Sequence, residues 1–234
     1  MIKIETHCHT RNSSRCASAF PNSLIEEYKE KGYGGAVLTN HLCYNYFSAY
    51  EGKTERQKIE FYISLIRQFE KACKENDFRC FYGAEILVKT PDNAYREFIL
   101  VGFNKSFLRA NKPLFYYTQE ELFEIAEKHG FYLYQTHPQR GTIVFGNPKY
   151  MHGAESFNGH VNHQNNNAKA KEYIVEKGLK MMSGTDYHDA YQPITGGIYI
   201  PENIKTNKQL AKYLRENQPK LIEEVELYEK FLRK

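Results

Sequence analysis

The sequence contains no tryptophan, no CxxC pair and no long apolar run. Its 234 residues include five cysteines, an odd number, so we expect a reducing cytoplasmic compartment rather than a disulfide-stabilised secreted domain. No apolar stretch approaches the ~20 residues of a membrane-spanning helix, and Met1–Ile4 leads into a predicted strand with no signal peptide before it. We therefore expect no membrane partner.

The chain also lacks a large excess of positive or negative charge. The formal net charge is only +4, and basic residues are mixed with acidic ones, which argues against an extended nucleic-acid surface. The chain has no Pro/Gly/Ser-rich linker and no internal repeat. Hydrophobic residues at 41% and charged residues at 26% are ordinary for a globular protein, so we expect one domain over residues 1–234.

Short strand-like runs alternate with helical patterns along the chain. Strands are expected over Ile2–His7, Gly35–Thr39, Cys80–Lys89, Glu97–Phe103, Phe131–Gln135, Gly153–Phe157, Lys180–Ser183 and Lys220–Val225. Helices are expected over Ser23–Lys31, with Asn22 or Ser23 as cap, and over Glu55–Glu75, Thr118–Lys128, Ala168–Lys177 and Asn207–Glu216. The alternation indicates parallel strands with right-handed crossovers, apart from a hairpin expected around Pro91-Asp92-Asn93. About seven such units favour an α/β barrel over a doubly wound sheet.

Histidine, by contrast, is abundant, with nine residues in the chain. Polar side chains lie in or directly after most of the predicted strands: His7, His9, Asn40, His41, Glu85, His137, Asn158, His160, Asp186 and His188. The carboxyl ends of parallel strands meet at one mouth of a barrel. We therefore expect these groups to gather in one place, although they span most of the chain.

The gathered groups are of the types that bind divalent ions. Alternate residues of a strand point the same way, so His7 and His9 can face one ion while Cys8 faces elsewhere. Imidazoles with carboxylates suit Zn, Mn, Fe and similar ions, and Glu85 has two oxygens with which to bridge two of them. Ions about 3.5–4 Å apart can clamp a phosphoryl group and turn a water into a nucleophile.

Two of the remaining histidines have structural explanations. His129 ends a predicted helix, where a basic side chain suits the helix dipole, and His152 lies in a loop expected at the surface. The role of His163, beside a run of asparagines, stays open.

Six segments together resemble the PHP (polymerase and histidinol phosphatase) domain. They are ETHCHT (Glu5–Thr10), LTNH (Leu38–His41), GAEI (Gly83–Ile86), YQTHPQR (Tyr134–Arg140), ESFNGH (Glu155–His160) and SGTDYH (Ser183–His188). They occur in the family's order over nearly the whole chain. The chain looks most like the small stand-alone bacterial members that are metal-dependent phosphoesterases. The resemblance implies a distorted (β/α)7 barrel with two or three divalent ions.

The resemblance also implies roles for single residues. His7, His9, Glu85 and Asp186 match ligands of a first ion; Glu85 with His137 matches a second; His41 and His188 match a third. The implied reaction is hydrolysis of a small phosphomonoester or phosphodiester by attack of a metal-bound hydroxide, with Asp186 and His188 in the catalytic centre. Arg140 and Arg15 are candidates to hold phosphate oxygens. His160 is a candidate general acid or substrate contact.

The sequence departs from the family pattern in ways that make two ions a safer expectation than three. Many members place His, Asp or Glu in the loop after the first histidine pair, where this chain has Arg11-Asn12-Ser13-Ser14-Arg15. Some members have a further histidine between the Glu of the GAEI segment and the His-Pro motif, whereas the only histidine of this chain in that interval is His129. The family also often has Asp where this chain has Asn40.

Three other functions remain open at this point. A nuclease could stack bases on aromatic residues near the second strand: Tyr44, Tyr46, Phe47 and Tyr50. An amidohydrolase-like barrel also begins with His-x-His, but would need a bridging lysine at a strand end, and no convincing one is present. A non-catalytic regulatory protein could keep the ligands for metal binding alone. The metal, the physiological substrate and the oligomeric state are not specified by the sequence.

Overall fold

A computed structural model describes residues 1–12, 16–45, 52–88 and 94–232. The strands are β1 (Ile2–Cys8), β2 (Tyr33–Leu38), β3 (His41–Leu42), β4 (Arg79–Val88), β5 (Arg96–Val101), β6 (Tyr132–Gln135), β7 (Gly153–Asn158), β8 (Lys180–Gly184), β9 (Gly196–Ile200) and β10 (Lys220–Glu223). The helices are α1 (Pro21–Glu30), α3 (Glu55–Glu75), α4 (Lys105–Ala110), α5 (Gln119–His129), α6 (Asn167–Glu176), α7 (Asn207–Glu216) and α8 (Val225–Phe231), with 3₁₀ turns η1 (Leu114–Tyr116) and η2 (Pro148–Tyr150). Within these ranges, no helix has both the length and the apolar character needed to cross a bilayer.

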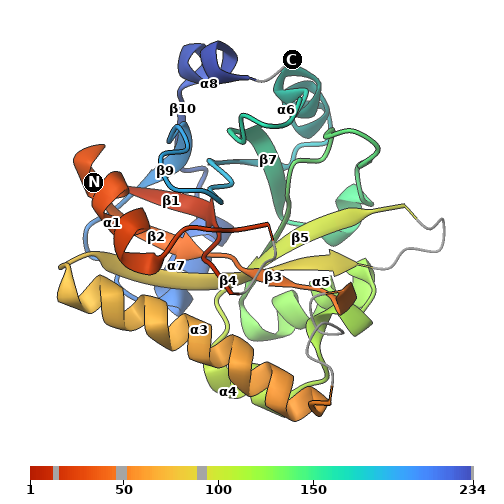
Figure 1. The fold of residues 1–234 in the computed structure, drawn as a ribbon. Helices are drawn as coiled ribbons and strands as arrows, with labels where there is room; N and C mark the ends of the chain where they lie inside the picture. The colour runs from red at the N-terminus through yellow and green to blue at the C-terminus, as the bar shows by residue number, and fades with distance from the viewer. Residues whose placement is uncertain (13–15, 46–51, 89–93, 233–234) are drawn as a thin grey trace.

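The strands form one sheet that curls into a nearly closed barrel (Figure 1). The order across the sheet is β10-β9-β1-β2-β4-β5-β6-β7-β8, and β3 pairs with β4. The last strand of this order returns to β1, because Thr6 Oγ1 donates a hydrogen bond to Ser183 O at 2.6 Å and Cys8 forms a parallel bridge with Tyr187. The predicted α/β barrel is confirmed.

The two faces of the sheet have separate apolar cores. On the outer face, α1, α3 and α5 contribute Leu24, Ile63 and Leu122 to one buried cluster, and Figure 1 shows α3 lying along the outside of the barrel. On the inner face, Ile4 and other strand residues pack with α7. Two hydrogen bonds join α7 to the beginning of β4. Arg79 of β4 donates to the carbonyl oxygen of Ile204, which precedes α7, and the backbone N–H of Tyr82 donates to Oδ1 of Asn207, the first residue of α7. This helix therefore covers the amino ends of the parallel strands and leaves their carboxyl ends for other residues.

One predicted helix cap is confirmed and another is corrected. The capping box predicted at Thr118 and Glu121 is present, and α5 ends at Gly130 in the left-handed conformation with φ 70°. The predicted cap of the first helix at Asn22 or Ser23 is wrong. That helix begins at Pro21. Proline lacks a backbone N–H, which costs nothing in the first helical turn because N–H groups there have no acceptor within the helix.

The strand directions also need correction, because the sheet is mixed. β5 runs antiparallel to both β4 and β6, and β9 runs antiparallel to both β1 and β10. The antiparallel β4–β5 pair agrees with the predicted hairpin, whose turn around Pro91-Asp92-Asn93 lies outside the described residues. The predicted final strand over Lys220–Val225 ends at Glu223, and α8 follows it. Short elements such as β3, α4 and α8 were not predicted, since so few residues carry little periodicity.

A buried carboxylate, Glu5, joins the ends of β1 and β8. Its Oε1 accepts hydrogen bonds from the backbone N–H groups of Thr6, His7 and Thr185 at 2.8–2.9 Å, and its Oε2 accepts one from Tyr28 at 2.6 Å. Burial raises the pKa of Glu5 to about 7, and the four donors oppose this by stabilising the ionised carboxylate without solvent. Glu5 therefore fixes the backbone just before the polar residues that follow both strands.

We expect Glu5→Gln to lower the free energy of unfolding by about 2–3 kcal/mol, because an amide offers one acceptor oxygen to four donors and brings two donors of its own. Urea denaturation followed by circular dichroism measures the change. Glu30→Gln, at an exposed position in α1, is the matched control and should leave the midpoint unchanged. Equal midpoints for both variants would show that the Glu5 carboxylate has no such role.

Candidate metal centre

The strand-end residues singled out in the sequence lie together at the carboxyl ends of the parallel strands. The group consists of His7 in β1, His9 after it, His41 in β3, Glu85 in β4, His137 after β6, and Asp186 and His188 after β8. Almost all of these side chains are buried; His41 is the most exposed, with 12% of its side chain accessible. Cys8 points away into the outer core and donates to Val37 O, as the alternation predicted.

A first set of four residues brings two imidazoles against two carboxylates. His7 Nε2 lies 3.3 Å from Glu85 Oε1 and 3.2 Å from Asp186 Oδ1, and His9 Nε2 lies 3.3 Å from Glu85 Oε2 and 3.3 Å from Asp186 Oδ1. Tetrahedral zinc with bonds of ~2.0–2.1 Å has its ligand atoms about 3.3–3.4 Å apart. The four nitrogen-to-oxygen distances match this spacing, so His7, His9, Glu85 and Asp186 are candidate ligands of a first divalent ion.

Hydrogen bonds behind the cluster determine which imidazole nitrogens face it. His7 Nδ1 donates to Glu155 Oε1 at 2.8 Å, and His188 Nδ1 donates to Asp186 O at 2.9 Å. Each Nδ1 therefore carries a proton, and Nε2 is the nitrogen that each ring turns toward the cluster. No described residue forms a hydrogen bond with His7 Nε2 or with either nitrogen of His9. Buried nitrogens left in this state are suited to a metal ion.

A second set of groups lies beside the first and shares Glu85. His137 Nε2 lies 3.1 Å from Glu85 Oε1 and 3.6 Å from Glu97 Oε2, while Glu97 Oε1 lies 3.8 Å from His41 Nδ1. Two carboxylates thus face the same pair of imidazoles. With one oxygen toward His137 and another toward His9, Glu85 has the geometry of a bridge between two ions.

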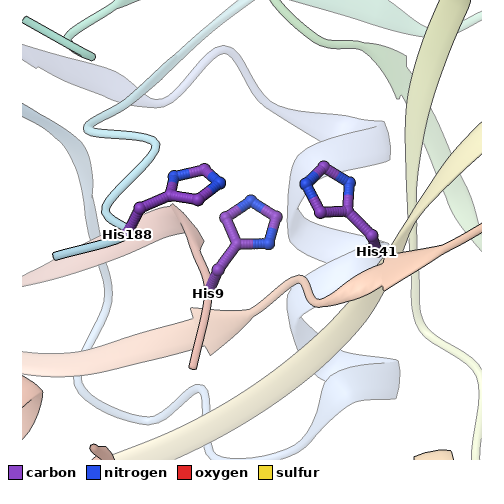
Figure 2. Close-up of side chains that lie close together, drawn as sticks. All are labelled: His9, His41 and His188. Atoms are coloured by element: carbon purple, nitrogen blue, oxygen red, sulfur yellow. The ribbon is translucent and has the colours of Figure 1, made fainter. Parts of the chain in front are cut away.

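A third set consists of imidazoles. The rings of His41 and His188 lie 4.4 and 4.2 Å from the ring of His9, with nitrogens close enough to share one ion (Figure 2). The thiol of Cys16 is in hydrogen-bonding contact with His41 and His188. Burial disfavours the Cys16 thiolate, but the contacts with His188 and His41 outweigh burial and lower the pKa of Cys16 to about 5.

The charges of the cluster hold one another in place. Burial alone would raise the pKa of Asp186 and of Glu85, but His7 and neighbouring cations outweigh burial and hold both values well below the ordinary range. Burial would likewise lower the pKa of His7 and His41, but the carboxylates outweigh it and raise both. Burial and the charge of Glu85 raise the pKa of Glu97. Protons on imidazoles therefore supply the positive charge that bound cations would otherwise provide.

The three residues predicted to contact substrate have different outcomes. Arg140 lies in the cluster, where it donates to Asp186 Oδ2 and Asn158 Oδ1, both at 2.6 Å. His160 accepts a hydrogen bond from Asn162 N at Nδ1, and burial, with help from nearby cations, lowers its pKa to about 3. A neutral His160 presents Nε2–H as a donor. Arg15 lies outside the described residues, and the roles of Arg140 and His160 toward substrate stay predictions.

Three residues of the cluster were not assigned a role from the sequence: Glu97, Glu155 and Cys16. Glu97 could have been found as the single carboxylate near the start of an apolar strand. That strand, β5, runs antiparallel to β4, away from the mouth of the barrel. Glu155 accepts from His7 Nδ1 and from His137 N, both at 2.8 Å, and its signal is a carboxylate inside a fully buried strand. Cys16 carried no signal beyond its place after the first histidine pair.

Backbone geometry brings the strand ends unusually close. His137 and Asp186 both adopt positive φ values, 27° and 54°, which are uncommon outside glycine and concentrate at functional sites. A Cβ on Gly184 would lie 2.6 Å from the Cβ of His7. Only glycine permits this approach, which brings Asp186 within reach of the first histidine pair.

Comparisons with known proteins identify the fold. No family model matches the sequence, and no curated protein matches it. Similar solved structures include a two-domain protein from Bacteroides vulgatus that contains a predicted PHP-like metal-dependent phosphoesterase; it is 14% identical, with a TM-score of 0.64, and the match covers 98% of this chain and 69% of that one. A provisionally assigned metal-dependent phosphoesterase from Bifidobacterium adolescentis is 13% identical, with a TM-score of 0.53, and the match covers 90% of this chain and 95% of that one. An amidohydrolase from Chromobacterium violaceum, with bound sulfate and no metal, is 12% identical, with a TM-score of 0.57, and the match covers 95% of this chain and 98% of that one. At these identities the likeness shows the fold alone.

We expect metal binding to release protons and to strengthen as pH rises through neutrality. Because the pKa values of His7, His41 and His188 are raised, these imidazoles hold protons that an incoming ion must displace, and protons compete more strongly at lower pH. Calorimetric titration with Zn²⁺ at about pH 6 and about pH 8, in buffers of different ionisation enthalpy, measures both effects. Affinity independent of pH, without proton release, would contradict the assignment.

We also expect Glu97→Gln to weaken binding of one ion by at least about tenfold, since loss of partners even outside the ligand shell has effects of that size. Metal content after dialysis, together with a titration, measures the loss. The matched control is Glu124→Gln at an exposed position in α5. If Glu97→Gln binds as many ions as the control, with the same affinity, Glu97 is not a ligand.

Proposed function

We propose that this chain, whose fold is that of PHP-like metal-dependent phosphoesterases, is an enzyme that hydrolyses small phosphate esters with two or three divalent ions. The observation that carries the proposal is the convergence of His7, His9, Glu85 and Asp186, whose imidazole nitrogens lie 3.2–3.3 Å from the carboxylate oxygens. Ions bound there would supply Lewis acidity, which lowers the pKa of water and polarises a phosphoryl oxygen.

The residues divide into three sets of ligands that share members. His7, His9, Glu85 and Asp186 would hold the first ion. Glu85 and Glu97 with His137 would hold the second, and His41 with His188 would contribute to a third. Zn, Mn and Fe all suit this mixture of imidazoles and carboxylates.

The charge balance of the loaded centre favours an anionic substrate. Three carboxylates face the ions: Glu85, Glu97 and Asp186. Two divalent cations, with the nearby Arg140 guanidinium, exceed that negative charge. A positive, largely buried site attracts a phosphate group more strongly than an uncharged amide.

Exposure indicates the side from which a substrate enters. Most of the cluster is inaccessible, whereas the side chains of Glu97 and Arg140 are 20% and 15% exposed. Arg140 holds Asp186 and so orients a ligand of the first ion. His160, neutral with its proton on Nε2, would donate a hydrogen bond to a phosphoryl or leaving-group oxygen.

The alternatives differ in what they require. An amidohydrolase-like centre needs a bridging lysine, and here the carboxylate of Glu85 has the bridging geometry. For a nuclease, Tyr44 is exposed but packs edge-on against Phe115 at 6.4 Å, while Tyr46, Phe47 and Tyr50 lie outside the described residues. Phosphate ester hydrolysis is therefore the function that the site supports best, and a cytoplasmic location and a single domain remain our expectations.

The test is turnover of a chromogenic phosphomonoester and its diester counterpart with Mn²⁺, Zn²⁺ or Fe²⁺. Asp186→Asn should lower turnover at least about 100-fold, because it removes a ligand and the charge that supports His7. Chelation should abolish turnover in the unmodified protein. Asp77→Asn is the matched control, because Asp77 is exposed and asparagine tolerates its positive φ of 48°.

Two further substrates separate the alternatives in the same assay. Turnover of a chromogenic amide without turnover of the phosphate esters would replace the proposal with an amidohydrolase. Cleavage of a single-stranded oligonucleotide alone would replace it with a nuclease. Metal binding without turnover of any ester would indicate a binding protein, and full activity in Asp186→Asn would remove that residue from the centre.

A further inference from the structure

A run of three asparagines, residues 165–167, leads into α6 and binds the loop that carries Arg140. Asn165 Oδ1 accepts a hydrogen bond from Arg140 Nε at 2.7 Å, and Asn166 Nδ2 donates to Gln139 O at 2.8 Å. Asn166 adopts the left-handed conformation, with φ 50°, which asparagine tolerates better than most residues. The run therefore holds both the head of the Arg140 side chain and the peptide just before it.

Asn165 is itself fixed from two further sides. Its side chain is buried, and Nδ2 donates to the carbonyl oxygens of Asn158 and His160 at 3.0 and 3.2 Å. Its backbone N–H donates to the hydroxyl of Tyr228 in α8 at 3.2 Å, and the same hydroxyl donates to His163 O at 2.8 Å. The C-terminal helix α8 thus anchors the segment that contacts Arg140.

These bonds determine which atoms of Arg140 remain for a ligand. Nη2 donates to Asn158 Oδ1 and to Asp186 Oδ2, so Nε–H and both N–H groups of Nη2 are engaged. Among the residues that the structure describes, none accepts a hydrogen bond from Nη1, and the Arg140 side chain is 15% exposed. A planar guanidinium held at two of its three nitrogens cannot rotate, so the direction of Nη1 is fixed.

The chemistry of the carboxamide suits this task. Asn165 and Asn158 accept from the guanidinium without carrying a negative charge, so neither cancels the charge of Arg140. A carboxylate at either position would form an ion pair with Arg140 and weaken its attraction for an anion. A guanidinium that keeps its charge and has Nη1 unengaged is suited to a phosphate oxygen.

We propose that Asn165 is a positioning residue that holds Arg140 for the phosphate group of the substrate, with Tyr228 as its anchor. The inference deepens the proposed function and rests on it for the class of substrate. It assigns a role to the asparagine run and to α8, both of which lie outside the ligand sets of the ions. Phosphate affinity should therefore depend on a residue that contacts neither the phosphate nor an ion.

Binding of inorganic phosphate to the full chain loaded with Mn²⁺ tests the proposal by calorimetric titration. Asn165→Ala should raise the dissociation constant for phosphate about tenfold, because the guanidinium loses the contact that fixes its plane. Bound Mn²⁺ should stay the same. The matched control is Asn203→Ala at an exposed position, which should leave the dissociation constant unchanged.

A double-variant cycle separates positioning from a general structural effect. In an Arg140→Ala background, Asn165→Ala should change phosphate affinity by less than about twofold, because the route through the guanidinium is already lost. An equal loss in both backgrounds would overturn the proposal. So would an unmodified, metal-loaded protein that does not bind phosphate.

Tyr228→Phe guards against misfolding as the cause of any loss, because it removes a single hydroxyl. It should weaken phosphate binding about threefold, and an unchanged affinity would reject the anchoring role of Tyr228. Ester turnover with normal phosphate affinity in Asn165→Ala would leave the proposed function standing and reject the positioning role. Weaker phosphate binding in Asn165→Ala, without ester turnover by the unmodified protein, would do the reverse.

Discussion

The structure depends on a concentration of charge that would be unstable without compensation. Glu85, Asp186 and Glu97 all lie against one group of imidazoles, in a part of the barrel with little access to water. Buried carboxylates in such numbers require cations close by. In the ion-free state protons on His7 and His41 serve as those cations, and they occupy the places that divalent ions would take. Divalent ions bound there would therefore exchange for these protons.

The precision of the cluster comes from residues behind it. Glu155 fixes the proton of His7 on Nδ1 and also accepts from the backbone N–H of His137, so one carboxylate orients parts of two ligand sets. Glu5 joins the ends of β1 and β8, which carry the first histidine pair and Asp186. Buried carboxylates satisfied by several donors are rigid, and rigidity in the supporting shell keeps ligand atoms within bonding range of an ion.

Much of the site could be predicted because ligands at the carboxyl ends of parallel strands converge wherever a barrel forms. The seven residues expected at the centre all lie there, and the alternation of β1 placed Cys8 in the outer core. Glu97 was missed because it begins a strand, and only the antiparallel direction of β5 brings that beginning to the mouth of the barrel. The hairpin was expected, but the position of Glu97 depends on the register that pairs it with Leu87. Hydrophobic periodicity does not specify this register.

Cys16 shows a different limit, because its position depends on hydrogen bonds between an irregular segment and the residues after β8. No local pattern of residues encodes such a contact, whereas departures from a family pattern can indicate where to look. The loop after His9 lacks the imidazole or carboxylate found in many PHP proteins, and a third ion looked unsupported for that reason. Cys16 follows that loop, and against the effect of burial His188 and His41 lower the pKa of its thiol to about 5. Likewise, the histidine missing before the His-Pro motif has a counterpart in the carboxylate of Glu97. A carboxylate in place of an imidazole would alter which metal that position prefers, because carboxylate oxygen is a harder ligand than imidazole nitrogen.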